Sequence, residues 1–76
     1  MVEQQEVYNY LTDYEGIKWN SNHLAQIFQC SICNMNLVLL KMIHNIHKFP
    51  GYKREETKRI SKNGRSYLSF LYFVKK

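Results

Sequence analysis

The sequence is poor in residues that break secondary structure, with one proline and three glycines among 76 residues. Gly16, Pro50-Gly51 and Asn63-Gly64 are the only strong breakers, and no repeat, linker or low-complexity tract lies between them. The chain is also too short for two domains. We therefore expect a single domain over residues 1–76, built from four segments.

Long apolar runs are absent, since no stretch approaches the roughly 18–20 residues that a membrane-spanning helix needs. Residues 1–10, MVEQQEVYNY, are acidic and polar, whereas a signal peptide begins with basic residues and continues with apolar ones. The two cysteines are most simply free thiols of a reducing compartment. We expect a cytoplasmic protein that is not secreted and does not contact a membrane.

Charge is unevenly distributed along the chain. Residues 1–30 hold four acidic residues against one lysine, a balance of −3, while residues 31–76 hold ten basic residues against two acidic ones, a balance of +8. The two halves account for the total of +5. A basic half on a small domain attracts polyanions, of which nucleic acid is the commonest.

Two segments near the N-terminus have the apolar spacing of helices. Residues 2–15 place apolar side chains at intervals of three and four, and Gly16 is a plausible stop. That set is Val7, Tyr10, Leu11 and Tyr14. Residues 17–19 are too short for more than an extended bridge. A second helix is predicted over 21–29, capped by Asn20 or Ser21. Its inward side chains are predicted to be Leu24, Ala25 and Phe28.

A third helix is predicted over 32–48, with Ser31 as its cap and Pro50 as its limit. Its inward set is Met35, Leu39, Met42, Ile43 and Ile46. A β-hairpin is then predicted over 53–74, because Asn63-Gly64 is a strong hairpin signal in which both residues tolerate positive φ. Its second half, SYLSFLYFV, is expected to be a buried return strand.

This order of helix, bridge, helix, turn, helix and hairpin resembles that of the winged helix-turn-helix family of DNA-binding domains. The resemblance is carried most specifically by residues 24–42, LAQIFQCSICNMNLVLLKM, in which the family's apolar and small residues fall at fixed steps. These are Leu24, Ala25, Phe28, Cys30, Ser31, Met35, Leu39 and Met42. The resemblance implies an α+β fold of three helices followed by a two-stranded β-hairpin wing. The short chain is similar to small stand-alone regulators of archaeal viruses or plasmids.

The resemblance also implies a function, which is regulation of transcription by binding double-stranded DNA. The third helix is expected to enter the major groove, where asparagine can pair with adenine, and the wing to contact the backbone or the minor groove. The residues implied on the helix are Ser31, Asn34, Asn36 and Lys41. Those implied on the wing are Lys58, Arg59, Lys62, Asn63 and Arg65.

One departure from the family pattern keeps a second function open. Ile32, Cys33 and Leu37 stand where DNA-binding members usually carry basic or hydroxyl side chains. The alternative is a winged helix that acts as a protein-interaction adaptor without sequence-specific DNA binding. Because the core of so short a chain is marginal, we also expect a homodimer. Its interface is predicted to contain Leu37, Leu40, Leu71 and Phe73.

A small zinc module is the other alternative, formed by Cys30-x-x-Cys33 and His44-x-x-His47. If Cys33 and His44 share one helix, however, the rise of 1.5 Å per residue separates them by roughly 16 Å, too far for one ion. The zinc and helix-turn-helix interpretations therefore compete for the same residues, and we predict no metal. No catalytic set or phosphate loop is present, so we expect neither an enzyme, nor a cofactor, nor a small-molecule substrate.

Overall fold

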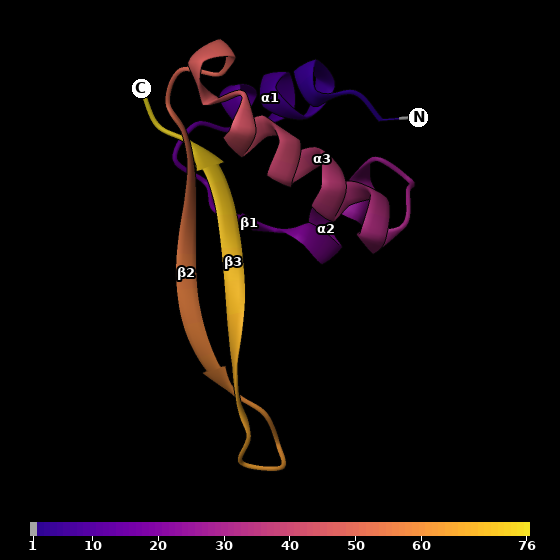
Figure 1. The fold of residues 1–76 in the computed structure, drawn as a ribbon, viewed down its shortest axis with the longest axis vertical. Helices are drawn as coiled ribbons and strands as arrows, with labels where there is room; N and C mark the ends of the chain where they lie inside the picture. The colour runs from indigo at the N-terminus through magenta and orange to yellow at the C-terminus, as the bar shows by residue number, and fades with distance from the viewer. Residues whose placement is uncertain (1) are drawn as a thin grey trace.

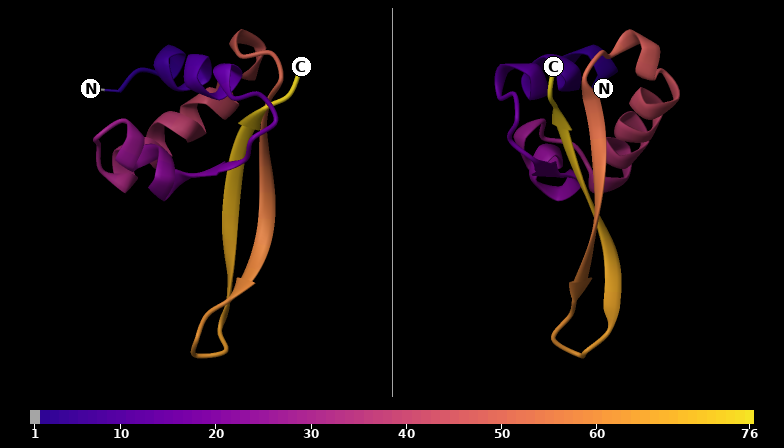
Figure 2. Two further views of the ribbon diagram at one scale, coloured as in Figure 1. Left: turned by 180° about the vertical axis from the view of Figure 1, so that it is seen from behind. Right: turned by 90° about the vertical axis from the view of Figure 1, so that its left-hand side faces the viewer.

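The structure is a computed structural model that describes residues 2–76, and it has the predicted α+β architecture. Three helices and a three-stranded antiparallel sheet are formed (Figure 1). The elements are α1 (Gln4–Asp13), β1 (Trp19–Asn20), α2 (Ser21–Ile27), α3 (Ile32–His44), a 3-10 helix η1 (Ile46–Lys48), β2 (Tyr52–Ile60) and β3 (Ser66–Val74). The helices gather at one end, and the β2–β3 hairpin projects well beyond them (Figure 2).

The prediction of a two-stranded sheet was wrong, because the bridge after α1 is a third strand. β1 pairs with β3 in the order β1-β3-β2, with Trp19 opposite Tyr72 and Asn20 opposite Leu71. Just before it, the Gly16 N–H donates to the carbonyl oxygen of Val74 at 3.0 Å. Backbone groups that leave solvent need such partners. The chain between α1 and α2 is therefore tied to the sheet.

Both predicted helix caps are confirmed. The Asn20 side chain accepts from the His23 N–H at 2.7 Å, and the Ser31 hydroxyl accepts from the Asn34 N–H at 3.1 Å. In each helix a short side-chain oxygen satisfies one of the backbone donors that the first turn leaves unpaired. These caps fix where α2 and α3 begin.

The predicted end of the third helix was wrong, since α3 stops at His44 and not at residue 48. Asn45 turns its side-chain amide back, donating to the Lys41 carbonyl at 3.0 Å and to the Gln4 side chain of α1 at 3.4 Å. Asparagine competes in this way with the helical backbone pattern. The chain continues as η1, so Ile46 is exposed and not inward as predicted.

The core lies between the helices and the base of the hairpin. Its most buried side chains include the predicted Val7, Leu11, Leu24, Ala25, Met35, Leu39 and Met42. Tyr14, the last residue of the predicted apolar stripe in the first helix, is exposed. Tyr8 was not predicted and is buried, with its hydroxyl donating to the Pro50 carbonyl at 2.7 Å. This contact fixes α1 against the segment that leads into β2.

The hairpin is paired from Tyr52–Val74 to Ile60–Ser66, and its turn differs from the one predicted. Gly64 has φ +78, but Asn63 does not have positive φ. The Gly64 N–H donates to Ser61 O at 2.9 Å, and the Ser61 N–H donates to Arg65 O at 2.8 Å. This is a type I turn followed by a left-handed glycine, a common longer hairpin loop.

The return strand β3 is buried only in its second half. Tyr72 and Val74 are in the core, whereas Tyr67 and Leu68 are about half exposed, so the prediction of a buried strand was wrong for the distal part. The strands are nine residues each and outrun the helical body that could cover them. The distal hairpin therefore offers both of its faces to solvent.

Stability at alkaline pH should depend on Tyr52, whose hydroxyl donates to the Leu39 carbonyl at 3.1 Å in a buried position. Burial raises the pKa of Tyr52, as does the neighbouring Tyr72, while Arg54 lowers it. Tyr52 is therefore harder to ionise in the folded protein than in the unfolded chain, where it ionises near pH 10. The stability that Tyr52 contributes is thus fully present below pH 10 and is lost as the pH rises above 10. Tyr52→Phe should cost about 1 kcal/mol at pH 7. It should also flatten the fall in unfolding free energy above pH 10, as measured by urea titration. An equally steep fall in the variant would contradict this assignment.

Candidate nucleic-acid interface

A tight turn joins α2 to α3 and sets the angle between them. Their axes are bent by 109°. The Gln29 N–H donates to Gln26 O at 3.2 Å and the Cys30 N–H donates to Ala25 O at 3.0 Å, which together form a Schellman motif. Within residues 2–76 no single helix is long and apolar enough to cross a membrane. Taken together, α2 and α3 have the length and apolar composition of such a helix, but a bend of 109° separates them.

Gln29 occupies the left-handed position of that motif, with φ +54, and is the one non-glycine residue in 2–76 with positive φ. An L-residue there costs about 1–2 kcal/mol, part of which glycine avoids. We expect Gln29→Gly to raise the unfolding free energy by about 0.5–1 kcal/mol. Gln29→Ala should change it little. Chemical denaturation measures both, and a destabilised glycine variant would show that the turn is not strained.

The predicted helix residues all lie at the exposed start or middle of α3, but not on one face. Ser31, Asn34, Asn36 and Lys41 are exposed. From the helical period, Asn34 and Lys41 share the side near α1, while Asn36 lies on the other side. The Ser31 hydroxyl is already engaged in capping. Two asparagines, on opposite flanks of α3, are therefore available to form direct hydrogen bonds with bases.

The centre of the exposed α3 surface is apolar. Leu37 and Leu40 are 55% and 45% exposed, and the thiol-bearing Cys33 is exposed beside them. Since the helical period puts these three residues opposite the buried Met35, they form the outermost line of the helix. A surface of this kind suits methyl groups or another protein better than phosphate.

The distal hairpin holds the densest group of cations. All five predicted hairpin residues are exposed there, namely Lys58, Arg59, Lys62, Asn63 and Arg65. In the described chain the one ion pair joins Lys18 to Glu55, at the base of the sheet. The four distal cations therefore have no acidic partner among residues 2–76 and stand at the far end from the helices (Figure 1).

The four residues predicted to form a dimer interface do not lie together. Leu37 and Leu40 are on α3, which covers the sheet face that bears Tyr72. Leu71 and Phe73 alternate with the buried strand residues and so point to the opposite face, where Lys18 Nζ lies 5.6 Å from the Phe73 ring. One contiguous patch cannot contain both pairs.

Two exposed apolar residues of the hairpin were missed by the sequence prediction. Ile60 is 78% exposed and Leu68 is 51% exposed, on the same face as Lys58. Their alternation with polar residues is the signal of a half-buried strand, and it does not reveal whether a helix covers that strand. The hairpin face that continues from the core thus combines cationic and apolar side chains.

The cysteine and histidine residues do not form a metal site in the described chain. Cys30 is half-buried, Cys33 is exposed, and both are free thiols. No group of three or more histidine, cysteine or acidic side chains suited to a metal ion occurs in residues 2–76. The zinc alternative therefore lacks a ligand set in this part of the chain.

Comparisons with protein-family models, with curated proteins and with solved structures found no match. The candidate interface is accordingly defined by geometry and charge alone. Its parts are the exposed surface of α3 and the cationic end of the hairpin, which extends past the helices (Figure 2).

Proposed function

We propose that this chain is a winged helix-turn-helix domain that binds double-stranded DNA as a transcriptional regulator. In this proposal α3 is the recognition helix and the β2–β3 hairpin is the wing. The observation that carries it is the group of four exposed, unpaired cations at the far end of the hairpin. A projecting loop of this charge fits the phosphate backbone or the minor groove of a duplex.

The balance of contacts favours the DNA backbone over the bases. Asn34 and Asn36 are the polar side chains near the start of α3 that can pair with adenine, while Leu37 can contact a thymine methyl group. Two asparagines provide limited discrimination, whereas Lys58, Arg59, Lys62 and Arg65 contribute to affinity irrespective of sequence. We expect strong binding to any duplex and a modest preference among sequences.

A salt series tests this proposal. The purified protein is titrated with a labelled random duplex at several salt concentrations, and fluorescence anisotropy gives the Kd. Neutralising Z phosphates releases counterions, so log Kd should rise linearly with log salt with a slope of about 0.9 Z. Four cationic contacts predict a slope of about 3–4. Absence of binding at low salt would refute the proposal.

A second function, that of a protein-interaction adaptor, is favoured by the exposure of Leu37 and Leu40 at the centre of α3. Apolar residues that lie centrally on an otherwise polar surface are typical of protein interfaces. The same salt series distinguishes the two functions, because a DNA-binding domain should bind a random duplex with steep salt dependence, whereas a protein-interaction adaptor should not.

A further inference from the structure

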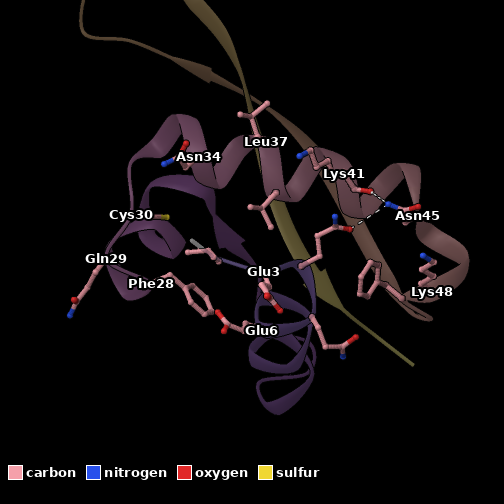
Figure 3. A pocket seen from close by; sticks show the side chains of 15 residues that line it. Glu3, Glu6, Phe28, Gln29, Cys30, Asn34, Leu37, Lys41, Asn45 and Lys48 are labelled. Carbon is pink, nitrogen blue, oxygen red and sulfur yellow. Dashed lines mark hydrogen bonds between the residues drawn. The ribbon is translucent and has the colours of Figure 1, made fainter.

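A groove of about 920 Å³ lies on the side of α3 that faces α1 and reaches the outermost line of the helix at Leu37 (Figure 3). Its walls come from the start of α1, from the turn between α2 and α3, and from α3 with η1. Asn45 closes one end, since its side-chain amide contacts Gln4. The groove is open along its length, so it can receive a surface as well as a small molecule.

The two rims of the groove carry opposite charges. Glu3 and Glu6 stand on the α1 rim, whereas Lys41 and Lys48 stand on the rim formed by α3 and η1 (Figure 3). All four side chains are exposed, and none makes an ion pair within residues 2–76. Each rim therefore has unsatisfied charge of one sign, with the same number of groups on both.

Apolar side chains lie between the two charged rims. The groove is lined by the apolar side chains of Phe28, Val38 and Phe49, together with Cys30 from the turn and Leu37 from α3. Leu37 is more than half exposed, and Phe28 and Val38 are only partly buried against the core. An apolar centre flanked by charges has the organisation of a protein interface, with a core and a polar rim.

We infer that this groove is the interface of a twofold homodimer, and that its occupant is a second copy of the chain. A twofold axis brings the same patch of both copies together, so the patch must be complementary to itself. A patch with one acidic and one basic rim meets that condition in charge when the axis runs parallel to the rims, because each copy's Glu3 and Glu6 then face the partner's Lys41 and Lys48. A partner of one net charge sign would match one rim and be repelled by the other.

The inference does not rest on the proposed DNA-binding function. The hairpin cations lie at the far end of the molecule and remain free in such a dimer, whereas Asn34 and Leu37 line the groove and would be withdrawn from DNA. The groove also replaces the interface expected from the sequence, because it contains Leu37 but not Leu71 or Phe73. A dimer would bury the apolar groove residues that this small chain leaves partly exposed, namely Leu37, Phe28 and Val38.

Charge reversal of one rim at a time is the test. Glu3→Lys/Glu6→Lys makes both rims basic, and Lys41→Glu/Lys48→Glu makes both acidic. Like charges across an interface cost several kcal/mol, so each variant should dissociate with a Kd at least about 100-fold higher than the wild type. Sedimentation equilibrium without DNA measures the Kd, and circular dichroism checks folding.

Mixing the two reversed variants gives the decisive measurement. The acidic rims of one should pair with the basic rims of the other, so a heterodimer of near wild-type affinity should form although each variant alone dimerises at least about 100-fold more weakly. Restoration by mixing cannot result from misfolding. Two matched controls make the same charge changes outside the groove: Asp13→Lys/Glu15→Lys is one, and Lys58→Glu/Lys62→Glu is the other. Each control variant should form its homodimer as the wild type does.

Three outcomes would overturn the inference. The wild type stays monomeric at millimolar concentration, the reversed variants dimerise as tightly as the wild type, or the mixture of reversed variants stays monomeric while the wild type dimerises. The last two results would mean that dimers form through another surface. A wild type that stays monomeric but binds the duplex would overturn only this inference, whereas a wild type that dimerises but binds no duplex would overturn only the proposed function.

Discussion

Replacing Lys62 and Arg65 together by alanine is expected to weaken binding to a random duplex by at least about tenfold near physiological salt. Both side chains are exposed in the loop that joins β2 to β3, and neither has an acidic partner in the described chain. Each lost phosphate contact removes close to one unit from the salt slope, so the slope should fall by about two.

The control for charge alone is Lys75→Ala/Lys76→Ala. These lysines are also exposed, but they lie at the C-terminus beside the helices, at the opposite end of the molecule from the hairpin loop (Figure 1). The change in net charge is identical in the two variants. Equal loss of affinity in both would show that binding follows overall charge and not the hairpin, and the wing assignment would then be wrong.

Asn34→Ala separates backbone contacts from base contacts in the same assay. Its effect should be small on random duplex, because phosphate contacts dominate non-specific binding. A selected high-affinity sequence should instead lose about 1–3 kcal/mol if Asn34 pairs with a base. If random and selected duplexes lose affinity equally, Asn34 does not read sequence.

Local chemistry made much of the helical part of this fold predictable. Asn20 and Ser31 cap their helices as expected, since a capping side chain bonds a backbone N–H only a few residues away. The end of α3 was missed because it depends on Asn45, whose amide also reaches Gln4 at the start of α1. No pattern within the helix itself contains that contact.

The sheet was less predictable because its determinants are distant in sequence. Trp19-Asn20 is too short to carry an alternation, and only its pairing with Tyr72 and Leu71 makes it a strand. The burial of β3 likewise depends on how far the helices extend over it, so Leu68 is exposed while Tyr72, on the same face, is buried. Alternation predicts a face but not what covers it.

The candidate site likewise has one part that was predictable from the sequence and one part that was not. Exposure of the hairpin cations was predictable, since charged residues near an Asn-Gly turn seldom find burial. The groove between α1 and α3 was not, because it combines Glu3 and Glu6 with Lys41 and Lys48 from segments far apart in the chain. Only the angle of 109° between α2 and α3 and the docking of α1 bring these groups into one groove.

Leu39→Ala is expected to have the largest effect on stability. Leu39 is completely buried, so truncating it should cost about 2–5 kcal/mol through lost burial and the cavity left behind. A chain of this length has a total stability of about 4–11 kcal/mol. The variant should therefore melt about 10–30 °C lower, as measured by differential scanning calorimetry.

Leu40→Ala supplies the matched control, because it is the same substitution one position along α3 at a side chain that is 45% exposed. Its cost should stay within about 0.5 kcal/mol, as for other surface truncations. The pair thereby tests the rotation of α3 about its own axis, on which both the outermost line of the helix and the groove beside α1 depend. Comparable losses in the two variants, or a larger loss for Leu40→Ala, would mean that α3 presents a different face to the core.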